Sequence, residues 1–152
     1  MTYYKDFSPC DYFPPEDWLC RLIAIGWLEQ GKPSDTAPTD KNFIAVIQTL
    51  NQEFQNVFPA FRTRGIHACS ICSSANNTET YLHDSHVNLF IPYQGLVFLA
   101  PGRIDHYVET HQYHPPQSFI DAVFACPSPL SDEYRNRMKI ANREHDAPLF
   151  ET

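Results

Sequence analysis

Proline is the sequence feature that most restricts what this chain can fold into. Thirteen prolines are spread over its 152 residues, and each one removes a backbone donor and fixes a backbone angle. The segments between them are short, so we expect a fold built from short helices and strands. The length is that of one domain, 1–152, which is large enough to bury a hydrophobic core.

The beginning of the chain combines aromatic residues with proline. In residues 1–20, MTYYKDFSPCDYFPPEDWLC, we expect irregular structure that wraps around the domain. Its expected anchors are the side chains of Tyr3, Tyr4, Phe7, Tyr12 and Phe13. The following run RLIAIGWL, 21–28, is continuously apolar and predicts a strand.

A helix and a hairpin form the middle of the predicted fold. Thr39 or Asp40 is expected to cap a helix that continues to about Asn56. Its core face recurs at three- and four-residue steps and consists of Phe43, Val46, Ile47, Leu50 and Phe54. HVNLFIPYQGLVFLAP, 86–101, predicts a β-hairpin with its turn at 92–95.

Three further helices are predicted after the hairpin, over 103–113, 117–124 and 131–145. Phe119, Ile120 and Val123 are expected to face inward in the second of them. In the third, Ser131 or Asp132 caps the helix, and one face carries Tyr134, Met138 and Ala141. The sequence therefore predicts an α+β fold with a small antiparallel sheet and about four helices.

Charge and hydropathy exclude several classes of protein. The net charge of −7 argues against nucleic-acid binding, which needs lysine and arginine, and is compatible with a basic protein partner. The chain has no run of eighteen apolar residues, so we expect no membrane span. The segment MTYYKDFSPC has the pattern of neither a signal peptide nor a transit peptide. We therefore expect a cytoplasmic protein.

The cysteines favour metal binding over a disulfide framework. Their number is odd and no secretion signal precedes them; they are Cys10, Cys20, Cys69, Cys72 and Cys126. In GIHACSIC, the spacing of Cys69 and Cys72 fits a metal-binding knuckle or a redox pair, and the two could also be ordinary reduced thiols. A redox pair prefers the start of a helix in a βαβ unit, and we expect no helix at Ser70-Ile71.

Two histidine pairs compete to complete a zinc site. His106 and His111 give the spacing C-x2-C … H-x4-H, although residues five apart on a regular helix point about 140° away from each other. His83 and His86 lie closer to Cys72 along the chain, which lowers the entropy cost of closing the loop. His67 and His114 are further candidates. The sequence therefore predicts a zinc-binding unit at 65–114. The residues alone do not decide which histidines are its ligands.

The predicted zinc is structural because two thiolates and two imidazoles complete a tetrahedral shell. The chain contains no HExxH motif, no histidine-x-glutamate before a CxxC, no GxSxG motif and no glycine-rich phosphate loop. The sequence therefore predicts a structural Zn²⁺ and assigns no catalytic residue.

The chain resembles a family of small bacterial proteins of unassigned function. The resemblance rests on YKDFSPCDYFP, an IGWL strand, a G-[FI]-H-x-C-x-x-C knuckle, a hairpin ending in AP, and H-Y-[VI]-x-x-H-x-Y-x-P-P-x-x-F-I-x-A-V. It implies a metal set of Cys69, Cys72, His106 and His111 and disfavours His83 and His86. It implies no activity, although similar bacterial proteins can occur near toxin and immunity systems.

The functional hypothesis is a non-catalytic, zinc-stabilised module that binds another protein. Its sharper form is an immunity-type protein that neutralises a basic bacterial toxin domain. The alternatives are a zinc-dependent enzyme with an open metal site and a nucleic-acid-binding zinc module, which the acidic charge disfavours.

Overall fold

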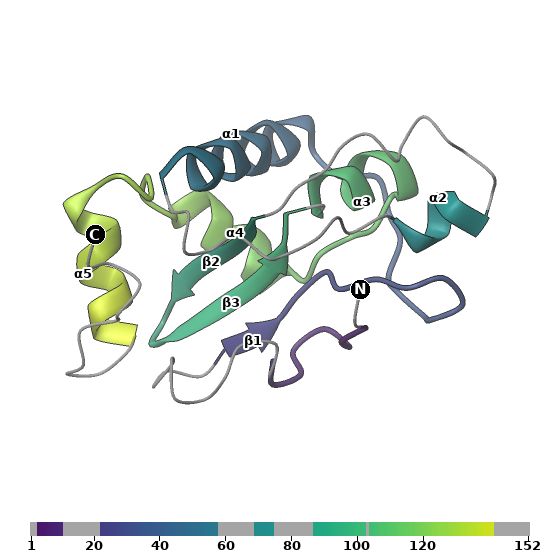
Figure 1. The fold of residues 1–152 in the computed structure, drawn as a ribbon, viewed down its shortest axis with the longest axis horizontal. Helices are drawn as coiled ribbons and strands as arrows, with labels where there is room; N and C mark the ends of the chain where they lie inside the picture. The colour runs from purple at the N-terminus through teal and green to yellow at the C-terminus, as the bar shows by residue number, and fades with distance from the viewer. Residues whose placement is uncertain (1–2, 11–21, 58–68, 75–86, 103, 142–152) are drawn as a thin grey trace.

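The protein combines a three-stranded sheet with helices, in a computed structural model that describes residues 3–10, 22–57, 69–74, 87–102 and 104–141 (Figure 1). In chain order the described elements are β1 (Leu22–Ala24), α1 (Lys41–Val57), α2 (Ser70–Ser74), β2 (Asn88–Tyr93), β3 (Leu96–Pro101), α3 (Ile104–His111), α4 (Gln117–Ala125) and α5 (Asp132–Ala141). The predicted α+β class is confirmed. The additional helix relative to the sequence prediction is α2, which has only five residues.

The predicted hairpin forms two of the three strands of the sheet, with β3 in the centre. β2 and β3 pair antiparallel, and the two residues between them, Gln94 and Gly95, both have positive φ, at 49° and 81°. Positive φ at both positions belongs to the type I′ turn, whose twist matches that of the flanking strands. β1 joins the other side of β3 in parallel, so the sheet is mixed, not antiparallel throughout.

The N-terminal segment lies along the free edge of β1. Phe7 N donates to Ala24 O, Ala24 N to Ser8 O and Cys10 N to Leu22 O, at 2.9 Å each. The segment is irregular, as predicted, and Tyr4 packs edge-on against Trp27. Phe7 was a wrong choice of anchor, because its side chain is 53% exposed. Tyr3 is half-buried, and two further expected anchors, Tyr12 and Phe13, lie outside the described residues.

The predicted helix caps and core faces account for α1 and α5. Asp40 caps α1 by accepting a hydrogen bond from Asn42 N at 2.9 Å, and Ser131 caps α5 through Tyr134 N at 3.2 Å. The buried α1 residues are Phe43, Ile47, Leu50 and Phe54, while Val46 is partly buried. The predicted α5 face, Tyr134, Met138 and Ala141, is buried as expected.

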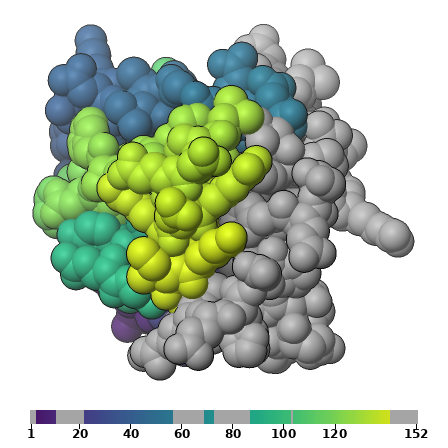
Figure 2. Space-filling model, turned by 90° about the vertical axis from the view of Figure 1, so that its left-hand side faces the viewer, coloured from purple at the N-terminus to yellow at the C-terminus, as the bar shows by residue number. Residues whose placement is uncertain are grey.

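Helix α5 packs on the outer strand of the sheet. Tyr134 OH donates to Phe90 O on β2 at 2.8 Å, and Figure 2 shows α5 across the middle of this face of the molecule. A buried hydroxyl that bonds an edge carbonyl satisfies both groups and covers part of the strand edge. Pro92, which has no backbone N–H, lies on this same edge strand.

Helix α3 follows the hairpin directly and is fixed by α1. Asn51 of α1 donates from Nδ2 to Gly102 O at 2.7 Å, which holds the chain just before α3 begins. Gln48 of α1 lies 3.4 Å from Glu109 of α3. Ile104, the first residue of α3, is completely buried. These contacts fix the helix that carries two of the candidate ligands. Within the residues described, no helix has the length and apolar character needed to cross a membrane.

Candidate metal centre

The two thiols of the CxxC motif lie at the start of α2. Cys69 immediately precedes the helix and Cys72 lies in its first turn, and their side chains are only 2% and 4% exposed. Residues three apart on a helix share a face, so both sulfur atoms point to one side. The expectation that no helix begins at Ser70-Ile71 was wrong. Because a helix does begin there, this argument against a redox pair no longer holds.

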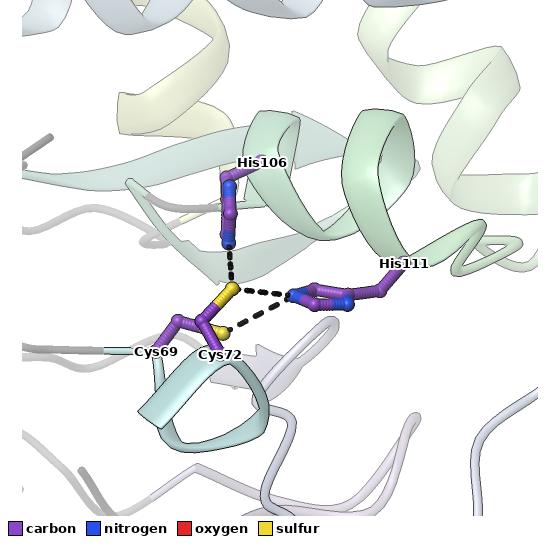
Figure 3. Close-up of side chains that lie close together, drawn as sticks. All are labelled: Cys69, Cys72, His106 and His111. Carbon is purple, nitrogen blue, oxygen red and sulfur yellow. Dashed lines mark hydrogen bonds between the residues drawn. The ribbon is translucent and has the colours of Figure 1, made fainter. Parts of the chain in front are cut away.

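The two histidines reach the thiols from opposite ends of α3. His106 lies in the first turn and His111 is the last residue, and both imidazole rings extend toward the cysteines (Figure 3). The His106 and His111 ring centroids are 5.0 Å apart and nearly perpendicular. The predicted angular difficulty does not keep the two rings apart, and the helix ends directly after His111, where Gln112 adopts a positive φ of 53° and Tyr113 N donates to Tyr107 O.

Three sulfur–nitrogen separations are close to those of a small tetrahedral site. The Nε2 atom of His111 lies 3.4 Å from Cys69 Sγ and 3.2 Å from Cys72 Sγ, and His106 Nε2 lies 3.4 Å from Cys72 Sγ. All four donor atoms lie within 4.8 Å of one another. Zinc–sulfur and zinc–nitrogen bond lengths place S and N about 3.6 Å apart in a tetrahedral shell. The four side chains could therefore bind a metal ion such as zinc.

Burial favours the neutral forms of Cys69 and His111 at the site. Desolvation raises the pKa of the Cys69 thiol and lowers the pKa of the His111 imidazole. A neutral imidazole is the form that ligates a metal. A divalent cation would compensate the buried charge of two thiolates, which otherwise have no cationic partner within this group of four.

Neighbouring polar groups hold the two helices in place. Asp105 is half-buried next to the first ligand of α3, and its Oδ1 accepts a hydrogen bond from His106 N at 2.8 Å. Burial raises the pKa of the Asp105 carboxyl. On the cysteine side, Ser70 Oγ accepts a hydrogen bond from Gln30 N at 3.0 Å, which joins α2 to the loop after β1.

The other sequence candidates are placed elsewhere or fall outside the described residues. Four of them lie outside the described residues: Cys20, His67, His83 and His86. Of the two competing histidine pairs, the structure therefore tests only His106 and His111. His114 is described and is not part of the cluster. Within the described ranges, no other group of three or more histidine, cysteine or acidic side chains converges on one point.

Two remaining cysteines have environments that suit unreactive thiols. Cys10 is buried in the hydrophobic core. Cys126 is half-buried, and desolvation raises the pKa of its thiol to about 12 despite the nearby Arg137. Because the thiolate is the reactive form, this burial disfavours reaction of the Cys126 thiol at neutral pH.

Two residues near the site were missed in the sequence. Ser70 lies between the cysteines and binds the Gln30 backbone, and Thr110 places its hydroxyl oxygen 3.3 Å from His106 Nδ1. The signal for Thr110 was its position four residues after His106, which puts both side chains on one helix face. The sequence held no comparable signal for Ser70, because its partner lies forty residues away.

Comparison with known proteins identifies a family but no activity. Neither the curated proteins nor the solved structures contain a match to this chain. Residues 2–124 match a family described as Domain of unknown function (DUF7919). The match includes all four residues of the metal-site cluster and ends before α5. Because it covers most of the chain, this protein belongs to the DUF7919 family.

Proposed function

We propose that this protein is a non-catalytic binding module stabilised by one structural zinc ion at Cys69, Cys72, His106 and His111. The observation that supports the proposal is the convergence of two thiols and two imidazoles within 4.8 Å, from segments separated by the whole hairpin. Thiolate and imidazole are the ligands of structural zinc, and two of each complete its preferred shell.

A structural role follows from the number and type of donors. Catalytic zinc usually has three protein ligands and keeps one position open for water or substrate. Here the four donors would fill the shell, and no carboxylate is part of the described cluster. The ion would join α2 to α3 and, through Ser70, hold the loop at Gln30. The bound ion would therefore hold in place α2 and the loop at Gln30, which lie outside the three-stranded sheet.

Elemental analysis of freshly prepared, reduced and tag-free protein tests the zinc proposal. We expect one zinc ion per chain in the wild type and in Cys126→Ser, and no retained zinc in Cys72→Ser or His106→Ala. Cys126 is the control because it is a free thiol, half-buried, that lies outside the cluster. Metal-free wild-type protein would overturn the proposal and make Cys69 and Cys72 ordinary or redox-active thiols.

Cobalt substitution tests whether the metal shell is closed. A Co²⁺ ion in a four-coordinate site of two sulfurs and two nitrogens should give an intense tetrahedral spectrum that added azide does not change. A spectrum that shifts with azide would reveal an exchangeable position. That result would replace the structural role with the alternative of a zinc-dependent enzyme.

We further propose that the binding partner is a basic protein, in its sharpest form a bacterial toxin domain that this chain neutralises. The support is electrostatic: the chain carries a net charge of −7, and helices α1, α3 and α4 contain four carboxylates and one lysine. Those carboxylates are Glu53, Asp105, Glu109 and Asp121. Opposite charge on a partner would orient docking and raise the association rate.

The partner proposal predicts strong dependence on salt. A partner captured from the native host at low salt should be basic, and its association rate should fall at least tenfold between 0.02 and 0.3 M salt, by rough estimate. Glu109→Gln combined with Asp121→Asn should lower the association rate several-fold. Asp132→Asn is the control, because Asp132 lies on α5 beside Arg135. Salt-independent association, or equal effects of all three substitutions, would contradict the proposal.

A further inference from the structure

Thr110 contacts the side of the His106 ring that faces away from the cysteines. Its Oγ1 atom lies 3.3 Å from His106 Nδ1, while His106 Nε2 lies 3.4 Å from Cys72 Sγ. The two ring nitrogens therefore have different partners. Thr110 is exposed and lies outside the cluster of four donor atoms, so it is not itself a candidate ligand.

We propose that Thr110 is a positioning residue for the metal centre, which it serves by holding His106 in the tautomer that ligates through Nε2. A neutral imidazole carries one proton, and a ring that offers the Nε2 lone pair to a metal must carry it on Nδ1. The Thr110 hydroxyl oxygen would accept that Nδ1–H. This inference rests on the proposed zinc site.

The geometry of α3 places the Thr110 hydroxyl beside the His106 ring. Thr110 follows His106 by four residues on α3, so the two side chains occupy one face a single turn apart. Thr49 provides a comparison on α1, since its hydroxyl donates to Ala45 O, the carbonyl four residues earlier. Thr49 therefore satisfies only its own helix, whereas Thr110 reaches the ring of a candidate ligand.

The expected effect is moderate because the contact is exposed. Partners of ligating histidines typically change metal affinity by about 10- to 100-fold. Water can replace an exposed hydroxyl and recover part of the interaction. We therefore expect the zinc dissociation constant to rise about tenfold when the hydroxyl is removed, at the low end of that range.

Competition with a chromophoric chelator measures that dissociation constant for the wild type and three variants. We expect Thr110→Val, which keeps the branched shape, to bind zinc about tenfold more weakly. Thr110→Ser keeps the hydroxyl and loses only the γ-methyl group, so its zinc dissociation constant should lie within about threefold of the wild-type value. Thr49→Val, the control on a second helix, should bind zinc as the wild type does. Long-range ¹H–¹⁵N spectra of the zinc-loaded protein should show a protonated Nδ1 on His106, with faster proton exchange in Thr110→Val.

Each result has a distinct meaning. A Thr110→Val constant within twofold of the wild type would overturn the positioning role and leave the zinc site intact. A Thr110→Ser variant as weak as Thr110→Val would also overturn it, because packing of the γ-methyl group would then explain the loss. Wild-type protein that binds no zinc would overturn both the site and this inference.

Discussion

Removing the proposed zinc ion is expected to lower the free energy of unfolding by about 4 kcal/mol, relative to protein at a free zinc concentration about a thousandfold above the dissociation constant. A ligand that binds only the folded chain stabilises it by that amount. For a chain of this length, the loss corresponds to a fall in melting temperature of about 12 °C. Thermal unfolding with and without a strong chelator measures it.

The reason for so large an effect is the small size of the elements that the ion would join. Helix α2 has five residues, far below the length at which an isolated helix is stable in water. Its polar contacts include the cysteine–histidine contacts and the bond from Gln30 N to Ser70 Oγ, and Ile71 packs against the core. Amide hydrogen exchange at Gln30 and in α2 should therefore accelerate most when zinc is removed.

Cys72→Ala should reproduce the loss without a chelator, and Cys126→Ala is its control. Cys126 donates only a weak bond to Pro127 O and is not part of the cluster, so zinc should be retained and the melting temperature should change by less than about 4 °C. Equal melting temperatures with and without chelator, in protein shown to contain zinc, would mean that the ion does not stabilise the fold.

The local elements could be predicted from the sequence because each has a local physical signal. Asp40 and Ser131 provide side-chain acceptors for exposed helix N–H groups, and apolar periodicity then sets the buried faces of α1 and α5. Gly95 tolerates a positive φ that the tight hairpin needs, although Gln94 also adopts one, which is uncommon for a residue other than glycine. These signals act within a few residues, where sequence reasoning is strongest.

The partner of β1 had no such signal. An apolar run such as RLIAIGWL predicts a buried strand but does not say which strand it joins or in which direction. In the structure it runs parallel to β3, and Trp27 Nε1 donates to Leu99 O across 72 positions of sequence. Only the tertiary fold decides that pairing, so the prediction of an antiparallel sheet held for the hairpin alone.

The candidate metal centre was predicted in part. The spacing of Cys69, Cys72, His106 and His111 made them one of two open sets, and the family resemblance favoured them. Helix α2 was missed because Ser-Ile-Cys-Ser-Ser has weak helix propensity and is too short to show periodicity. The expected one-domain organisation and the unit at 65–114 remain predictions, because much of 58–86 lies outside the described residues.

Gly26→Ala is expected to destabilise the protein by about 3 kcal/mol, from backbone strain and overpacking together. Gly26 has a φ of +76°, where a Cβ atom is disfavoured. A Cβ built at this position would lie 2.7 Å from Cδ1 and 3.1 Å from Cγ1 of Ile104. Ile104 is fully buried, so its side chain has little room to move.

The same substitution should weaken the metal centre, because Ile104 begins the helix that carries both histidines. Gly26 N also donates to Asp6 Oδ1 at 2.9 Å, and Asp6 Oδ2 accepts a hydrogen bond from the buried Tyr113 OH at 2.7 Å. A displaced Gly26 would therefore disturb the chain at both ends of α3. Chemical denaturation and the zinc dissociation constant, measured on the same variant, should both change.

Two further variants separate backbone strain from steric overlap. Gly31 has a φ of +83° with nothing within 4 Å of an added Cβ, so Gly31→Ala should cost only about 1 kcal/mol. Adding Ile104→Val to Gly26→Ala removes the Cδ1 atom that makes the closest approach and should recover part of the lost stability. If Gly26→Ala cost no more than Gly31→Ala, the contact with Ile104 would not constrain this turn. The start of α3 would then have to be fixed mainly by Asn51 and Asp105.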